Sequence, residues 1–377
     1  MMEWIRRQRY LIDFILSSLL RRKGKNFGLL LVYTLVVFML ASVMLFTHAL
    51  KREMGNVLQA SPEIILQRTE AGRHALIPAD YLEKIGRLRG VTGRKGRLWG
   101  YFYDATVKAN YTLMVADERG LADTEVIVGS AIARARGVGP GDYLTFRSHD
   151  GIAYSFMIRE LLDSDTELFS ADLVLMSERA FRVSQGVTGG GYTDIVLSVS
   201  NPRELSRIAE KLTQRLPDTR PILKQEILRT YDAIFSWRQG ILFVLLAGAI
   251  MAFVIFAWDK ASGLSAEEKR EIGILKAIGW ETGDVLQMKF WEGAILSVTA
   301  FFTGYLLAYL HVFYASASLF EPVLKGWAVL YPAFRLAPVV DGLQIATLFF
   351  FTVFPYVVAT IIPIWQASVT YPDAVMR

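Results

Sequence analysis

The sequence predicts a membrane protein of four transmembrane α-helices. It also predicts an amphipathic N-terminal helix, a short cytoplasmic helix between the second and third spans, and an α+β extracytoplasmic domain between the first two spans. Three observations support this fold class. Of the 377 residues, 53% are hydrophobic. Apolar residues gather in four runs near the ~20 residues that a ~30 Å hydrocarbon layer requires. The long segment between the first two runs mixes strand and helix patterns.

Charge and cysteine content exclude several classes of protein. The formal net charge is +5, and the basic residues cluster beside the apolar runs. This distribution favours loops that face lipid headgroups over a nucleic-acid surface. The chain has no Cys, which rules out a disulfide framework, thiol catalysis and a cysteine metal site.

Residues 1–26 are predicted to form a cytoplasmic interfacial helix, and residues 27–48 the first span. Leucines and isoleucines line one side of the N-terminal segment, and seven Lys or Arg residues precede the apolar run. A cleaved signal peptide is the alternative, with a weak cleavage site at 47–49. The apolar run is longer than the usual h-region of about 7–15 residues, so we expect a retained span.

The remaining spans are predicted at 240–258, 290–314 and 340–362. Basic residues are frequent before the first span and in the loop 259–289, but scarce in the short loop 315–339. The positive-inside rule then places both termini and the loop 259–289 in the cytoplasm, with residues 49–239 outside and the tail 363–377 inside.

The predicted spans contain few ionisable groups; among them Glu292 and His311 lie near the ends of the third span. Snorkelling to the interface is the favoured interpretation, and an ion pathway the alternative. The spans therefore offer no polar conduit. Pro355 is expected to kink the fourth span, and Gly248, Gly293 and Gly304 would allow close helix contact.

The extracytoplasmic segment shows an α+β pattern that is long enough to bury a core. Asn201 precedes a predicted helix, and Asp150-Gly151 is the turn of a predicted hairpin. Strands are expected at 63–67, 98–103, 111–115, 126–129, 144–147, 153–161, 172–176 and 194–199, and helices at 78–90 and 202–216.

Motifs of catalysis or nucleotide binding are missing from the sequence. There is no GxxxxGK[ST], HExxH or GxSxG, so we expect no catalytic, cofactor or metal site. Asp163, Asp165 and Glu167 lie close together, but the downstream Gly and Glu of a calcium loop are absent, which favours an ordinary polar loop. Aromatic residues of the loop 315–339 fit an interfacial belt better than a patch for a greasy ligand; they are Phe320, Trp327, Tyr331 and Phe334.

The segment 266–280, AEEKREIGILKAIGW, lies between the second and third spans. Acidic residues precede basic ones, as the helix dipole favours. Ile272, Leu275, Ile278 and Gly279 recur at three- and four-residue spacing, which predicts one apolar and one charged side. Such a helix can receive a push from a soluble partner and pass it to two spans. The alternative is a solvated connector on the membrane surface.

Three stretches resemble one family. Residues 268–280, EKREIGILKAIGW, resemble the EKRREIGILRAIGA motif of FtsX-like, MacB-type (type VII) ABC transporter permeases. The ending PIWQASVTYPDAVMR resembles that family's ending, although Met376 replaces the usual Leu and Trp365 stands where a basic residue is common. Val126 to Asp142 is similar to the family's external "VIVG…LGV…GD" pattern. The resemblance covers nearly the whole chain.

The resemblance implies a transporter assembly in the inner membrane of a bacterium. Two permeases, identical or sister chains, would bind two copies of a cytoplasmic ATPase, which would hold the ATP and Mg. This chain itself would be no enzyme. Membrane lipids and an extracytoplasmic accessory or substrate-bearing protein are further partners, and nucleic acid is not. The residues implied in coupling to the ATPase are Glu267, Glu268, Lys269, Arg270, Glu271, Ile272, Gly273, Leu275, Lys276, Ala277, Ile278, Gly279 and Trp280, with tail contacts at Pro372, Met376 and Arg377.

Three functions remain open from the sequence. The favoured one is mechanotransmission, in which ATP hydrolysis moves the external domain to export or extract an amphiphile such as a lipoprotein, haem, peptide or lipid-like molecule. The alternative is an FtsX-like regulator that activates a cell-wall hydrolase and moves no solute. A receptor or scaffold without an ATPase is the least favoured.

Overall fold

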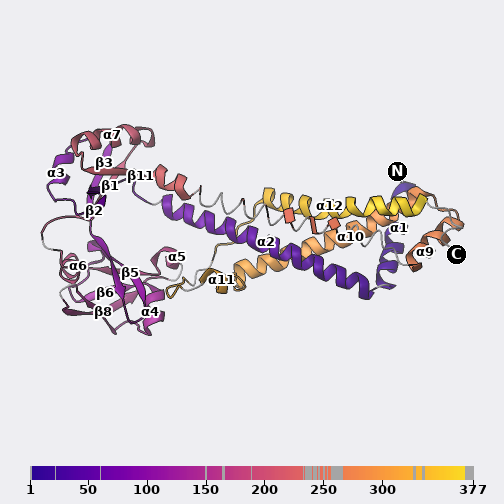
Figure 1. The fold of residues 1–377 in the computed structure, drawn as a ribbon, viewed down its shortest axis with the longest axis horizontal. Helices are drawn as coiled ribbons and strands as arrows, with labels where there is room; N and C mark the ends of the chain where they lie inside the picture. Colours follow the sequence, from indigo (N-terminus) through magenta and orange to yellow (C-terminus); the bar gives the residue numbers. More distant parts are fainter. Residues whose placement is uncertain are drawn as a thin grey trace. The chain divides into compact units, whose positions relative to one another are not determined.

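A computed structural model of the chain shows two separate units. It describes residues 2–231 except 22, 60, 149–150, 164–165 and 188, isolated positions between 233 and 255, and residues 266–369 except 326–327 and 333–335. The helical unit comprises 1–50, 235–317 and 337–377, and the α+β unit comprises 51–234 and 318–336. Figure 1 shows the elements of each unit. Most of the predicted second span and the end of the tail lie outside the described residues.

Long apolar helices dominate the helical unit. In chain order its elements are α1 Met2–Arg21, α2 Lys23–Gln59, α9 Ala266–Ala277, α10 Thr282–Tyr309, the π-helical turn η4 Leu310–Tyr314 and α12 Gly342–Val369. Among the described residues, three helical stretches are long and apolar enough to cross a membrane: Asn26–Gln59, Thr282–Tyr314 and Gly342–Ile361. They overlap the predicted first, third and fourth spans. Helix α2 continues to Gln59, well past the predicted end at residue 48.

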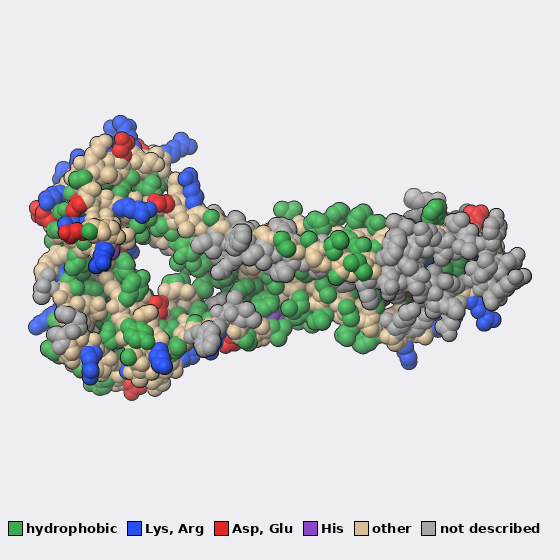
Figure 2. Space-filling view, viewed as in Figure 1, with side chains coloured by type: hydrophobic (Ala, Val, Ile, Leu, Met, Phe, Trp, Pro, Cys, Tyr) green, Lys and Arg blue, Asp and Glu red, His purple; other side chains and the backbone are tan. Residues whose placement is uncertain are grey.

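Glycine and hydroxyl groups mediate the packing of α2, α10 and α12. Gly304 of α10 lies against the backbone of α2, and Gly293 lies beside Tyr356 and Thr360 of α12, as predicted for close helix contact. Tyr33 Oη donates to the carbonyl oxygen of Thr352 at 2.7 Å, which joins α2 to α12. Helix α12 runs through Pro355 without a break. On the face drawn in Figure 2, hydrophobic side chains cover much of the described part of these helices.

The first lobe of the α+β unit is an antiparallel sheet in the order β11-β1-β10-β3, with β2 paired to β1. Leu66 and Ile195 pair across its centre and are fully buried. Helix α7 buries Leu205, Ile208 and Leu212 on the same core. The elements are β1 Ile64–Glu70, β2 Arg73–Ala75, α3 Tyr81–Ile85, β3 Val91–Arg97, β10 Asp194–Val199, η3 Pro202–Glu204, α7 Leu205–Arg215 and β11 Thr219–Leu223.

The second lobe is a mixed sheet in the order β4-β5-β9-β6-β8-β7. The pairs β5–β9 and β6–β8 are parallel, and the other pairs are antiparallel. Tyr111, Val126, Ile132 and Phe146 are buried in its core. The elements are β4 Trp99–Asp104, β5 Ala109–Val115, η1 Asp117–Arg119, β6 Glu125–Val128, α4 Ser130–Arg136, β7 Tyr143–Arg147, β8 Ala153–Leu161, α5 Glu167–Ser170, β9 Leu173–Met176 and α6 Glu178–Gln185. The predicted α+β class is confirmed.

Residues 318–336, which follow η4 and precede α12, also belong to the α+β unit. We call this segment the strap. Its helix α11 covers Glu321–Lys325. The sequence predicted it only as a short extracytoplasmic loop within 315–339.

Some predicted elements differ from the observed ones. The helix expected over 78–90 shrinks to the five residues of α3, because Gly86 with φ 62° ends it. Strands β3 and β11 were not predicted, since glycines interrupt the first and Pro221 lies inside the second. Strand β11 borders only β1 in its sheet, so Pro221 is tolerated at an edge.

A buried carboxylate in the second lobe predicts acid sensitivity. The Asp104 carboxylate accepts hydrogen bonds from Tyr111 Oη at 2.7 Å and Thr106 N at 2.8 Å, and Arg136 lies 3.4 Å away. Burial opposes ionisation, but these partners together hold the pKa of Asp104 below its ordinary 3.8. The pKa of Asp218 in the first lobe is lowered in the same way, by Tyr81 and Arg68 against the effect of burial.

Both carboxylates should therefore stabilise the fold above about pH 4 and lose this contribution as the pH falls through their lowered values. We expect hydrogen exchange of the β4 and β5 amides in the full chain to accelerate between pH 5 and pH 3, after correction for intrinsic rates. Asp104→Asn should exchange faster at pH 5 and show a smaller change with pH. A change with pH as large as that of wild type would contradict this role for Asp104.

Candidate functional site

The predicted coupling segment forms helix α9, which ends in a tight glycine cap. Gly279 has φ 101°, a conformation that favours glycine. Its N–H donates to the carbonyl of Lys276, and the N–H of Trp280 donates to the carbonyl of Leu275. These two bonds define a Schellman motif. The sequence Ala-Ile-Gly-Trp thus ends the helix at a fixed point and turns Trp280 back towards it.

Helix α10 begins immediately after this cap. Glu281 is its N-cap, and a capping box joins Glu281 to Asp284. Since each side chain bonds the other's backbone N–H, the first turn of α10 is fixed. Only four residues separate α9 from α10, and each of the two helix ends is capped. The connection between α9 and α10 is therefore short and fixed by caps at both helix ends.

The faces of α9 differ from the predicted pattern. Ile272 and Leu275 are buried, as expected for an apolar side. Ile278 was assigned to the same side, but it is 68% exposed because it lies at the end of the helix, beside the glycine cap. Ile274, which is not part of the predicted apolar side, is 50% exposed. Four residues apart, Ile274 and Ile278 share one face of the helix.

Helix α1 supports α9 and α10 from the other side. Ile15 of α1 is buried with Leu275 and Met288 in one cluster. The rings of Phe14 and Trp280 lie 6.0 Å apart, and Trp291 Nε1 donates to Gln8 Oε1 at 2.9 Å. The predicted amphipathic N-terminal helix therefore buries part of its apolar side on protein, including Leu11 and Ile15, while Leu16 and Leu20 are exposed. No local pattern in the sequence indicated that its partners would be α9 and α10.

The remaining predicted coupling residues vary in exposure. Arg270 and Ala277 are exposed, Glu271, Lys276 and Trp280 are half-buried, and Gly273 is buried. The side chains of Glu267, Glu268 and Lys269 lie outside the described part of the chain, as do the tail residues Pro372, Met376 and Arg377.

Ionisable groups near the ends of the apolar helices have partners. Lys289 and Glu292 form an ion pair at 2.5 Å in α10. His311 lies in the π-helical turn η4, is buried, and bonds Ser42 Oγ of α2 through Nδ1 at 3.3 Å. The favoured expectation that His311 would snorkel to the interface is therefore wrong, because α2 supplies a polar partner inside the bundle.

The acidic loop near α5 contributes a buried ion pair to the fold. Glu167 is almost completely buried and pairs with Arg134 of α4. The described residues contain no group of His, Asp or Glu that could hold a metal ion. Asp165 lies outside them. The pair instead holds α4 and α5 together.

The C-terminal part of the chain matches a protein family. Residues 239–372, a range that contains α9, α10 and α12, match the model described as FtsX-like permease C-terminal. This range, which is less than half of the chain, is similar to the C-terminal region of FtsX-like permeases. The resemblance that the coupling motif and the chain ending indicated is confirmed. FtsX-like permeases are membrane subunits of ABC transporters. In general they work with a partner ATPase.

Two solved structures are similar to parts of this chain. The periplasmic region of MacB from Actinobacillus actinomycetemcomitans is 10% identical, with a TM-score of 0.32 over 46% of this chain and 93% of that one. The extracellular domain of the noncanonic ABC-type transporter YknZ from Gram-positive bacteria is 8% identical, with a TM-score of 0.30 over 43% of this chain and 100% of that one. A comparison with curated proteins found no match.

Proposed function

We propose that this chain is the permease subunit of a mechanotransmission ABC transporter in the inner membrane of a bacterium. Two copies of a separate cytoplasmic ATPase bind and hydrolyse ATP with Mg. Two permeases, identical or sister chains, convert this cycle into movement of the α+β unit outside. The movement exports or extracts an amphiphilic substrate, such as a lipoprotein, haem, peptide or lipid-like molecule. The spans themselves carry no solute.

The observation that supports this proposal best is the geometry of α9. The helix buries Leu275 against α1 and α10, also buries Ile272, and leaves Ile274 and Ile278 exposed. A cytoplasmic connector gains nothing from two exposed isoleucines on one face, whereas a helix that enters a groove on a partner buries such a pair. The caps that join α9 to α10 make the helix suited to transmit a displacement.

We expect the double variant Ile274→Glu/Ile278→Glu to insert normally but to lose its ATPase. Burying two carboxylates in an apolar groove without partners would remove most of the binding energy. The measurement is affinity purification of the tagged full chain from its native membrane, followed by mass spectrometry and ATPase assay. Loss of a nucleotide-hydrolysing protein, and of the associated activity, is the predicted outcome.

The matched control is Val183→Glu, an exposed aliphatic residue on α6 of the α+β unit, which should retain the ATPase. Equal recovery with both variants would contradict docking through α9. The same purification separates the two candidate functions. A bound lipid, haem or lipoprotein supports transport, while a cell-wall hydrolase bound to the α+β unit would replace transport by regulation.

A further inference from the structure

The α+β unit is formed by two chain segments, 51–234 and 318–336. The first lobe follows directly after the end of α2. Lys224 Nζ donates to the carbonyl of Gln59, and Lys224 N donates to the carbonyl of Glu63 at 2.9 Å. After β11 the chain is helical over 224–231 and leads towards the predicted second span. The first lobe is therefore tied to the first two spans by short covalent connections.

The second lobe has no such direct connection. It is inserted into the first lobe between β3 and β10, so the chain passes between the lobes only at 97–99 and 186–194. Its other attachment is the strap, which is covalently continuous with η4 and α12. Because the strap follows the third span and precedes the fourth, it connects these two spans covalently.

Described residues of the strap pack on the second lobe. Leu330 lies against the lobe's hydrophobic core. Arg134 Nη2 donates to the carbonyl of Tyr331 at 3.2 Å, while the same guanidinium pairs with the buried Glu167. Leu330 thus supplies apolar contact, and Arg134 holds the neighbouring backbone.

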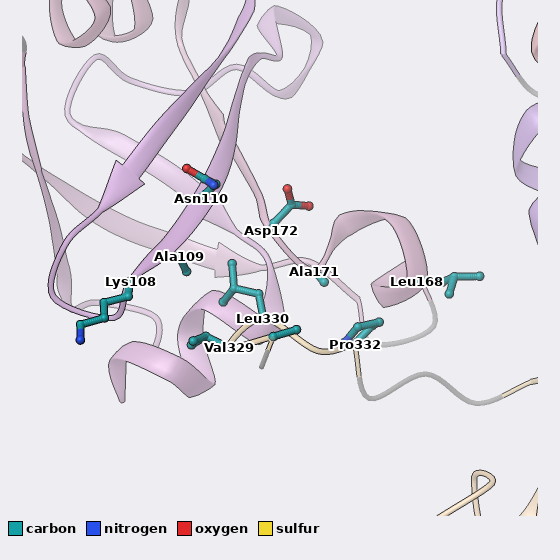
Figure 3. A pocket seen from close by; sticks show the side chains of 10 residues that line it. Lys108, Ala109, Asn110, Leu168, Ala171, Asp172, Val329, Leu330 and Pro332 are labelled. Atoms are coloured by element: carbon teal, nitrogen blue, oxygen red, sulfur yellow. The ribbon is translucent and has the colours of Figure 1, made fainter. Parts of the chain in front are cut away.

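Figure 3 shows the strap residues Val329, Leu330 and Pro332 beside the ends of β5 and α5. A cavity of about 410 Å³ lies between them and is lined mainly by small or apolar side chains, including Ala109, Leu168 and Ala171. The cavity means that the strap is not packed continuously on the lobe. Among the described residues of the strap, Leu330 packs on the lobe's core and the backbone of Tyr331 is held by Arg134.

We propose that the strap is a second mechanical link, which ties the second lobe to the third and fourth spans while the first lobe follows the first and second. A movement of one pair of spans against the other would then change the angle between the lobes. This inference rests on the proposed function, since the ATPase cycle is what drives the spans.

The angle between the lobes would change at the two chain segments that connect them, 97–99 and 186–194. Trp99, the first residue of β4, donates its backbone N–H to Thr193 Oγ1 at 3.0 Å, and that hydroxyl donates to the carbonyl of Trp99 at 2.8 Å. Trp99 Nε1 also donates to the Asp194 carboxylate at 2.9 Å. These bonds keep the two crossing segments together, so the lobes would pivot about them instead of separating.

Spin labels on the two lobes test the link. The chain has no Cys, so Gln214→Cys on α7 and Ala153→Cys on β8 would carry the labels alone; both positions are exposed. Labelled chain is mixed with excess unlabelled chain, to suppress distances between copies, and reconstituted in nanodiscs. Without nucleotide, we expect a narrow distribution of distances between the two labels in the chain that carries only these two substitutions. Adding Leu330→Asp should release the strap and abolish the narrow distribution.

Two further variants serve as controls. Leu330→Met keeps an apolar side chain and should retain the narrow distribution. Leu319→Asp places the same charge on the strap, at a side chain that is 59% exposed. This variant should also retain the narrow distribution. Labels at Ala153→Cys and Asp117→Cys, both in the second lobe, should report the same distance in every variant if the lobe stays folded. An unchanged distribution between the lobes in Leu330→Asp would overturn the inference.

The copurified ATPase with a non-hydrolysable ATP analogue supplies the second arm. The distance between the lobes should shift in the Leu330→Met background and should not shift in Leu330→Asp, although the ATPase remains bound. If no ATPase copurifies, the proposed function fails and the nucleotide-free arm still tests the strap. If the ATPase binds and Leu330→Asp shifts as the control does, the strap inference fails and the proposed function stands.

Discussion

Gly304→Val is expected to prevent the helical unit from assembling. A Cβ atom at this position would lie 2.8 Å from the carbonyl oxygen of Thr34, 2.9 Å from Cβ of Val37 and 3.0 Å from N of Phe38. Two of these three atoms belong to the backbone of α2, so no side-chain rotation relieves the overlap. The helices must move apart instead, which loses contacts along their whole length. Overpacking costs about 1–3 kcal/mol even where side chains can adjust.

The measurement is the thermal stability of the detergent-solubilised full chain, followed by size-exclusion chromatography after heating. Gly304→Val should give little monodisperse protein, and Gly304→Ala should melt below wild type. Gly293→Ala, on the same helix, is the matched control, because its Cβ would meet Thr360 and Tyr356 at ordinary distances of 3.5 and 3.8 Å. A wild-type melting temperature for Gly304→Val would contradict the close crossing of α2 and α10.

Asp194→Ala should loosen the crossing between the two lobes. The Asp194 side chain is 1% exposed and binds Arg97 through two hydrogen bonds of 2.7 Å, while also accepting from Trp99. Removing one partner of a buried ion pair costs about 3–5 kcal/mol. Arg97 keeps 29% of its surface in water, so we expect about 3 kcal/mol. The free-energy loss corresponds to about a 100-fold rise in local opening.

Hydrogen exchange of the full chain measures this opening at 97–99 and 193–199. Asp123→Ala is the matched control, since its ion pair with Arg179 lies 3.4 Å apart on the surface of the same α+β unit. Exposed pairs contribute about 0–1 kcal/mol, so exchange at the crossing should not change. Equal protection in Asp194→Ala and wild type would show that other contacts hold the lobes together.

Hydropathy and periodicity were sufficient for the three apolar helices that the structure describes and for most strands of the α+β unit. Runs such as 27–48 are defined by composition, and strands such as β6 and β9 by short buried apolar stretches. The physical reason why a particular residue type is required at a position could be identified only from the tertiary structure. Gly129, part of the Val126–Asp142 resemblance, caps α4 where a Cβ would lie 2.2 Å from the carbonyl oxygen of Ser170.

Contacts between distant segments could not be predicted from local pattern. The three- and four-residue spacing in 266–280 identified a helix with buried Ile272 and Leu275, but not the exposure of Ile274 and Ile278, which depends on where α1 and α10 pack. Nothing in the local sequence around Leu330 distinguishes it from other apolar loop residues. Only the tertiary structure places it against the second lobe. His311 was misassigned for the same reason, since its partner Ser42 is on another helix.

The central claim is that a nucleotide-driven partner moves the α+β unit through α9. A cryo-electron microscopy map of the full chain, purified with its native partners, tests this most directly. The account predicts density for Ile274 and Ile278 inside a groove of a nucleotide-binding subunit. A map in which α9 faces only lipid or solvent, with any ATPase bound elsewhere, would contradict it.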